Sequence, residues 1–119
     1  MTQKILIVED EIIVATDLEA MLRRYGYQVV GIASTGAEAI SLSRQLEPNL
    51  ILMDIGLRGG IDGIDTAAEI REHWNVPFIY LTGNTSEETL SRAMATQPLG
   101  YIAKPIRDRE LKLNIDIEF

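Results

Sequence analysis

Five short apolar runs recur along the chain at regular intervals. The runs are Ile5–Val8, Val29–Ala33, Leu50–Met53, Val76–Leu81 and Leu99–Ala103. They are rich in β-branched or aromatic residues, and their apolar positions are consecutive. Consecutive apolar positions are typical of strands that are covered on both faces, as in a parallel sheet. The pattern therefore predicts five buried strands, each ending at a polar or glycine-containing segment.

The segments between these runs have helical character. Two of them carry apolar residues at three- and four-residue steps. These residues are Ile12, Ala15, Leu18, Leu22 and Tyr25 in the first segment, and Ile64, Ala67, Ile70 and Trp74 in the second. Residues 36–46 and 85–96 are rich in helix formers, and Gly26 is expected to end the first helix. Strand and helix alternate five times, which predicts an α/β fold with right-handed crossovers, as one domain over residues 1–119.

The C-terminal segment permits two structures. Leu111, Leu113, Ile115, Ile117 and Phe119 alternate at a period of two, which on its own favours a strand. A helix would instead place Leu111, Ile115 and Phe119 on one stripe. Because the preceding units alternate strand and helix, we predict a closing helix, although the periodicity alone does not show it.

Composition removes several classes of function. The 119 residues suffice for one domain, and the absence of cysteine excludes disulfides, thiolate catalysis and cysteine zinc sites. The formal charge of −7 argues against a nucleic-acid surface. No apolar run approaches the ~20 residues of a membrane span, and the N-terminus does not resemble a signal peptide. We therefore expect a cytoplasmic protein that binds neither nucleic acid nor membrane.

Chemically active residues follow four of the predicted strands. They are Glu9 and Asp10, then Asp54, Thr82 and Lys104. In open α/β sheets, ligands bind outside the carboxyl ends of the strands, where such residues meet. Three carboxylates at one place repel one another, and Mg²⁺ is the natural partner of carboxylates and a phosphate. The lysine and the hydroxyl would complete a phosphoryl site, with Asp54 on the central strand as the best-placed nucleophile.

These residues lie in five short motifs that stand in order at the strand ends. The motifs are Ile7–Asp10, Leu52–Asp54, Asp62–Gly63, Leu81–Gly83 and Tyr101–Pro105. With them, the sequence resembles the receiver domain of two-component response regulators, the family of the chemotaxis regulator CheY, over essentially the whole chain. The resemblance implies a (βα)5, flavodoxin-like fold whose parallel strands lie in the order 2-1-3-4-5.

The resemblance also implies an acceptor and a metal site. Asp54 would accept a phosphoryl group from the phosphohistidine of a sensor histidine kinase or a histidine phosphotransfer protein. Asp10, Asp54 and the backbone carbonyl of Gly56 would bind Mg²⁺, or Mn²⁺ in its place. Glu9 would assist through water.

A switch is implied by the same resemblance. Thr82 and Lys104 would bind the phosphoryl oxygens, and the peptide bond between Lys104 and Pro105 would be cis. Tyr101 would turn inward when Thr82 moves toward the phosphoryl group. The signal would then pass to the surface formed by the helix near 85–96, the strand near 99–103 and the closing helix, through which a homodimer would form.

Two segments lie close to the predicted acids in the sequence, residues 55–61 and Ile12–Ile13. Residues 55–61 lack the proline that the family often carries there and contain three glycines, so we expect a longer and looser loop. Gly56 has no side chain to shield the phosphoryl group, so we expect a short-lived acyl phosphate. Ile12 and Ile13 follow the acid pair, and an exposed one would either dock a kinase helix or be ordinary exposed apolar surface.

Three other functions compete with this interpretation. A phosphatase of the haloacid dehalogenase type needs an Asp two residues after its nucleophile, where this chain has Gly56. A flavin or dinucleotide binder needs a glycine-rich turn after the first strand, where Glu9, Asp10 and Glu11 would repel a pyrophosphate. An inactive receiver would serve only protein contacts, which the retained site residues argue against. We expect a signalling switch and not a turnover enzyme; the kinase, the output and any further domain stay open.

Overall fold

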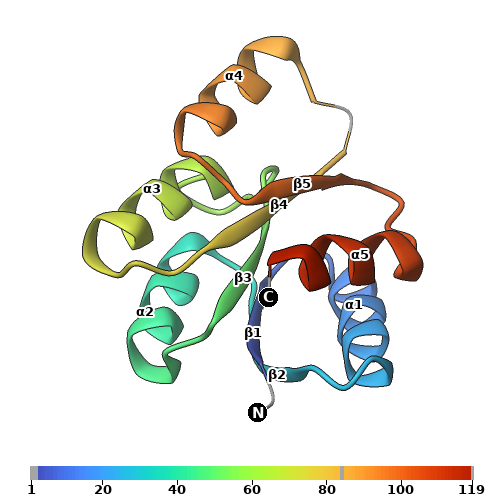
Figure 1. The fold of residues 1–119 in the computed structure, drawn as a ribbon. Helices are drawn as coiled ribbons and strands as arrows, with labels where there is room; N and C mark the ends of the chain where they lie inside the picture. The colour runs from blue at the N-terminus through green and yellow to red at the C-terminus, as the bar shows by residue number, and fades with distance from the viewer. Residues whose placement is uncertain (1–2, 84, 119) are drawn as a thin grey trace.

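The computed structural model describes residues 3–83 and 85–118, and a five-stranded parallel sheet forms its centre (Figure 1). Strands and helices alternate along the chain. They are β1 (Lys4–Val8), α1 (Ile12–Arg24), β2 (Gln28–Ala33), α2 (Gly36–Leu46), β3 (Leu50–Asp54), α3 (Gly63–His73), β4 (Phe78–Thr82), α4 (Glu87–Ala95), β5 (Gly100–Ala103) and α5 (Asp108–Glu118). The strands lie in the order β2-β1-β3-β4-β5, and every neighbouring pair is parallel. The predicted fold class and strand order are confirmed.

Helices cover both faces of the sheet, which explains the consecutive apolar residues of the strands. Helices α1 and α5 lie on one face and α2 and α3 on the other (Figure 1). In β1, Ile5 and Ile7 join the cluster that includes residues of α1 and α5, whereas Leu6 and Val8 join the cluster that includes residues of α2 and α3. Every residue of β3 and β4 is buried. Because both faces of the sheet are buried, polar residues that could bind a ligand lie at the ends of the strands.

Local sequence signals define the helix ends. Thr35, Asp62 and Ser86 each cap a helix N-terminus by accepting a hydrogen bond from the backbone N–H three residues later. Gly26 lies just past α1 with a φ of +87°, a conformation that glycine adopts without strain. The predicted end of the first helix is therefore confirmed.

The buried faces of α5 and α1 bear on two sequence predictions. The C-terminal segment is a helix, with Leu111 and Ile115 buried and Leu113 exposed, while the predicted stripe residue Phe119 lies outside the described residues. Ile12 follows the helical period of α1 but lies outside its buried stripe: Ile12 and Ile13 are 78% and 76% exposed, so both are exposed apolar residues of the kind that sequence analysis allowed there. The buried stripe consists of Ala15, Leu18 and Leu22. Ile12 lies in the first turn, on the flank of that stripe.

No helix within residues 3–83 and 85–118 is long and apolar enough to cross a membrane.

Candidate functional site

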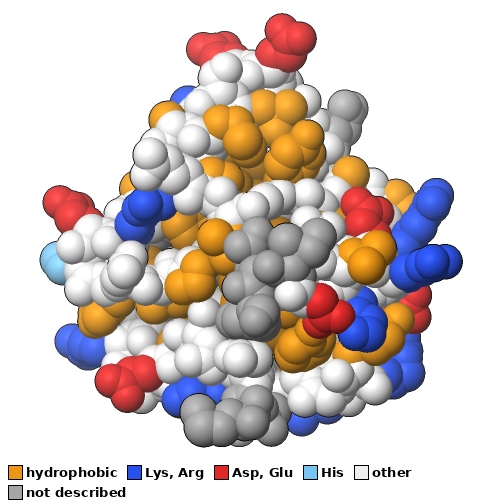
Figure 2. Space-filling model, viewed as in Figure 1, with side chains coloured by type: hydrophobic (Ala, Val, Ile, Leu, Met, Phe, Trp, Pro, Cys, Tyr) orange, Lys and Arg blue, Asp and Glu red, His pale blue; other side chains and the backbone are white. Residues whose placement is uncertain are grey.

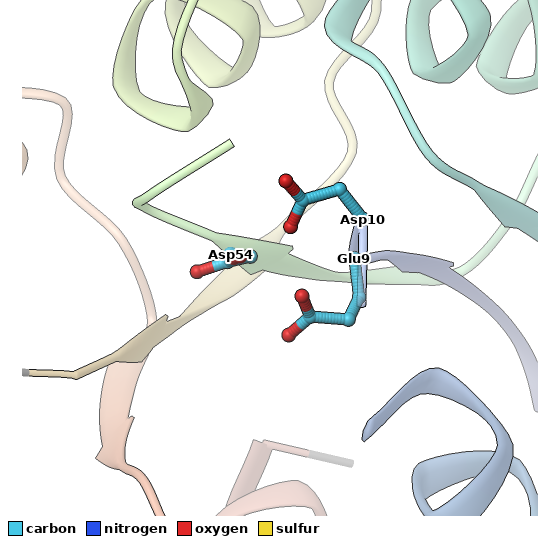
Figure 3. Close-up of side chains that lie close together, drawn as sticks. All are labelled: Glu9, Asp10 and Asp54. Atoms are coloured by element: carbon cyan, nitrogen blue, oxygen red, sulfur yellow. The ribbon is translucent and has the colours of Figure 1, made fainter. Parts of the chain in front are cut away.

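Three carboxylates meet at the carboxyl edge of the sheet (Figure 3). Glu9 and Asp10 directly follow β1, and Asp54 is the last residue of the neighbouring strand β3. One carboxylate oxygen from each residue lies within 4.8 Å of the other two. Glu9 and Asp54 are buried, and Asp10 is partly exposed. Strand pairing therefore brings together the three acids that sequence analysis selected.

Lys104 is the cation nearest to the two buried acids. Its Nζ lies 2.7 Å from Oε1 of Glu9 and 3.4 Å from Oδ1 of Asp54. Its backbone N–H donates to the carbonyl of Thr82, and its peptide bond to Pro105 is cis. Burial acts to lower the pKa of Lys104, but Glu9 and Asp54 outweigh it and raise that pKa. Lys104 is therefore held as a positive charge beside Asp54.

Glu9 is the acid whose charge the site accommodates least well. Its burial raises its pKa to about 7, against the opposing effects of the Lys104 ammonium and of the Glu11 N–H, which donates to Oε2 over 3.1 Å. The nearby charge of Asp54 acts in the same direction as burial and is part of this net rise in the pKa. The other oxygen, Oε1, is buried and makes the ion pair with Lys104 without an aligned hydrogen bond. The two buried carboxylates share the single charge of Lys104, so the cluster fits a bound cation.

This raised pKa predicts how stability depends on pH without a divalent cation. Because the folded-state pKa of Glu9, about 7, exceeds its ordinary value of 4.5, proton binding favours the folded state. The stabilisation is complete below pH 4.5 and is lost as the pH rises through 7. We expect the free energy of unfolding to fall by about 1–3 kcal/mol across that range, by the linkage between pKa and stability. Urea denaturation in the presence of a chelator, repeated across this pH range, measures the free energy of unfolding.

The matched control is Glu9→Gln, which cannot titrate at this position. We expect its free energy of unfolding to change less with pH across the same range. Two results would contradict the attribution of this pH dependence to Glu9. One is a wild-type protein that is more stable at pH 7 than at pH 4.5. The other is a Glu9→Gln variant whose free energy of unfolding changes with pH as much as that of the wild type.

Asp10 has its own cation, Arg58, which sequence analysis missed. Nε of Arg58 donates to Oδ2 of Asp10 over 2.9 Å. Burial acts to raise the pKa of Asp10, but the hydrogen bond from Arg58, with smaller contributions, outweighs it and lowers that pKa. A single arginine among glycines, 48 residues from its partner, carries no sequence signal of this pair.

Of the remaining predicted residues, Thr82 and Gly56 lie at the site and Tyr101 does not. Thr82 is buried at the end of β4, beside β3, and the N–H of Gly56 donates to Oδ1 of Asp54 over 3.0 Å. An open cavity of about 630 Å³ lies against Asp54, Gly56 and Lys104. Tyr101 is not brought into this site, because its side chain is exposed on β5.

The loop after Asp54 differs in part from expectation. Ile55 and Leu57 are buried and join the core cluster next to α2 and α3, so the first half of the loop is anchored. Gly59 and Gly60 have φ values of +82° and +128°. The prediction of a loose loop was therefore wrong for its first half, because apolar side chains there reach the core.

The fold and these residues define an α/β protein with an acidic cluster and a lysine at the carboxyl edge of its sheet. Comparison with known families identifies this class more closely. Residues 5–116 match the model of the response regulator receiver domain. The chain belongs to that family, whose members act in two-component systems, and the resemblance inferred from the motifs is confirmed.

Similar proteins agree with this membership. The transcriptional regulatory protein PdtaR of Mycobacterium tuberculosis is 36% identical over 109 residues, which cover 92% of this chain and 53% of PdtaR. The phyllosphere-induced regulator PhyR of Methylorubrum extorquens is 37% identical over 108 residues, which cover 90% of this chain and 40% of PhyR. The chain thus spans about half the length of these relatives or less.

Solved structures share the fold over nearly the whole chain. The signal receiver domain of a modulated diguanylate cyclase from Desulfovibrio desulfuricans superposes with a TM-score of 0.93, at 37% identity, covering 98% of this chain and 93% of that one. A CheY-like receiver domain protein from Methanospirillum hungatei superposes with a TM-score of 0.91, at 26% identity, covering 99% and 94%.

Proposed function

We propose that this chain is the phosphoacceptor of a two-component phosphorelay. Asp54 accepts a phosphoryl group from the phosphohistidine of a sensor histidine kinase or a histidine phosphotransfer protein, in a reaction that requires Mg²⁺. The observation that carries the proposal is the placement of Lys104 Nζ 3.4 Å from Asp54, within a cluster of three carboxylates, in a receiver-domain fold. The protein acts as a signalling switch in the cytoplasm and not as a turnover enzyme.

The donor set supports the metal requirement. Oxygen ligands from carboxylates are those that Mg²⁺ prefers, and Mn²⁺ accepts them too. Asp10, Asp54 and the carbonyl of Gly56 would hold the ion directly, and Glu9 would hold it through water. When bound, the ion offsets the charge of the acids and of the incoming phosphoryl oxygens.

The residues around Asp54 fit nucleophilic attack by its carboxylate. An Asp54 oxygen attacks phosphorus, a P–O bond forms, the P–N bond to the donor imidazole breaks, and that nitrogen keeps the electron pair. Lys104 and the Gly56 N–H lie against Oδ1 and orient the carboxylate. The Lys104 ammonium and the Thr82 hydroxyl would bind the transferred oxygens.

The signal would leave the site through Thr82 and Tyr101. We propose that Thr82 moves toward the phosphoryl group and that Tyr101 then turns inward from its exposed position on β5. Met94 on α4, Tyr101 on β5 and Leu113 on α5 are exposed apolar side chains. Figure 2 shows hydrophobic side chains gathered over the region of α4. This exposed apolar area supports the α4–β5–α5 surface as the output face, and a homodimer through it stays a prediction.

Gly56 predicts a short lifetime for the acyl phosphate. A Cβ added at this exposed position would meet only Oδ1 of Asp54, at 3.7 Å, which is ordinary contact. We expect Gly56→Asn to lose its phosphoryl group more slowly than the wild type, because the amide side chain would restrict access of water to Asp54. Intact mass, followed over time after removal of the phosphodonor, measures the loss.

Gly56→Ala is the matched control for that variant, since it adds the Cβ without the polar group. If Gly56→Asn loses phosphate as fast as the wild type, shielding at residue 56 does not set the lifetime. The acceptor role of Asp54 is tested separately: the wild type should gain one phosphoryl group from acetyl phosphate when Mg²⁺ is present, and Asp54→Asn should gain none.

A further inference from the structure

Two cations share the three carboxylates of the site unequally. Lys104 pairs with the buried Glu9 and Asp54, at 2.7 and 3.4 Å. Arg58 pairs with Asp10 alone, at 2.9 Å. In the absence of a metal ion, every acid of the cluster therefore has a protein cation beside it, and the one on Asp10 comes from a loop.

Breaking the ion pair between Arg58 and Asp10 costs far less free energy than breaking the ion pairs of Lys104. The Lys104 side chain is 19% exposed, whereas the Arg58 side chain is 78% exposed. Arg58 is followed by Gly59 and Gly60 on the exposed half of the loop. An ion pair with so exposed an arginine contributes little to stability, because water and salt screen it.

We propose that Arg58 competes with the divalent cation for Asp10 and thereby sets the affinity of the site for Mg²⁺. The inference rests on the proposed function, since it takes Asp10 as a ligand of that ion. Without the ion, the guanidinium neutralises Asp10. Binding of Mg²⁺ requires Asp10 to exchange Arg58 for the ion, so the free energy of the ion pair is subtracted from that of metal binding.

The surroundings of Arg58 fit a cation that is displaced and stays close. Besides Asp10, the negative charges of Glu11 and Asp54 act on Arg58 and raise its pKa, after the larger effect of Asp10 itself. Glu11 is exposed and lines the same cavity as Asp54. A released Arg58 therefore still faces an acid, and it returns to Asp10 when the ion dissociates.

The test is a titration of the protein with MgCl₂, followed by the amide resonances of Asp10, Asp54 and Gly56 in NMR spectra. We expect Arg58→Ala to lower the dissociation constant of Mg²⁺ roughly two- to fivefold, the range that the loss of an exposed ion pair allows. The difference should shrink as KCl is added, because salt screens the wild-type ion pair. Arg58→Lys should fall between the two, since lysine lacks the planar fork of arginine.

Arg92→Ala is the matched control. It removes the same charge, from a residue that lines the cavity against Asp54, but Arg92 pairs with Asp62 and Asp65 and not with the cluster. We expect its affinity for Mg²⁺ to stay near that of the wild type. Equal affinity in Arg58→Ala and wild type, or an equal gain in Arg92→Ala, would overturn the competition. Failure of the wild type to bind Mg²⁺ would instead overturn the proposed function.

Discussion

Replacement of Asp54 by Asn is expected to abolish the uptake of a phosphoryl group from acetyl phosphate. The wild-type protein should gain the mass of one phosphoryl group when Mg²⁺ is present and none when it is chelated. In the variant, the neutral amide is too weak a nucleophile to attack phosphorus, and it also removes a negative ligand from the metal site. Intact mass spectrometry of both proteins, with and without Mg²⁺, measures the difference.

The variant should fold, because the change preserves the size of the side chain and leaves Glu9 as a partner for Lys104. Asp62→Asn is the matched control: Asp62 caps α3 and lines the same cavity, and asparagine caps a helix equally well. We expect the control to take up phosphate like the wild type. Uptake by Asp54→Asn would mean that another residue is the acceptor, and no uptake by the wild type would favour an inactive receiver.

The sheet was predictable because its strands are buried on both faces. Consecutive apolar runs marked all five strands, and the errors lie at their ends. Lys4 and Gln28 begin their strands although they are polar, and β4 begins at Phe78 and not at Val76. Backbone pairing extends a strand beyond its apolar residues, which hydropathy does not detect. The strand order came from the family resemblance, since periodicity says nothing of which strands are neighbours.

The acidic cluster was predictable for a different reason. Glu9 and Asp10 follow β1 and Asp54 ends β3, and the sheet places these two strands side by side, so the topology alone brings the acids together. Arg58 was not predictable, because its position depends on the path of a loop and on a rotamer. Periodicity placed Ile12 in a helix but left its burial open, because a helix period does not state which flank of the stripe meets the sheet.

Gly63 is the glycine at which an added Cβ would make the closest contact with backbone. It is the first residue of α3, and its N–H donates to the carbonyl of Ile55. A Cβ at this position would lie 2.0 Å from the carbonyl oxygen of Asp54 and 2.8 Å from its carbon. Both atoms belong to the backbone of the central strand and cannot rotate away. The Asp62–Gly63 motif thus allows α3 to begin directly against Asp54, the proposed phosphoacceptor.

Two effects oppose each other in Gly63→Ala, and their sizes decide the result. Helix propensity favours alanine over glycine by about 1 kcal/mol, and overpacking against fixed backbone costs about 1–3 kcal/mol or more. At 2.0 Å the clash lies far inside van der Waals contact, so its cost should reach the upper end of that range, about 3 kcal/mol. We therefore expect a net loss of about 2 kcal/mol in the free energy of unfolding, measured by urea denaturation. Gly83→Ala is the control, because its Cβ would meet no atom within 4 Å, and it should change stability by less than about 0.5 kcal/mol. If Gly63→Ala were as stable as the wild type, propensity would outweigh the clash, and α3 would not be held this closely against the end of β3.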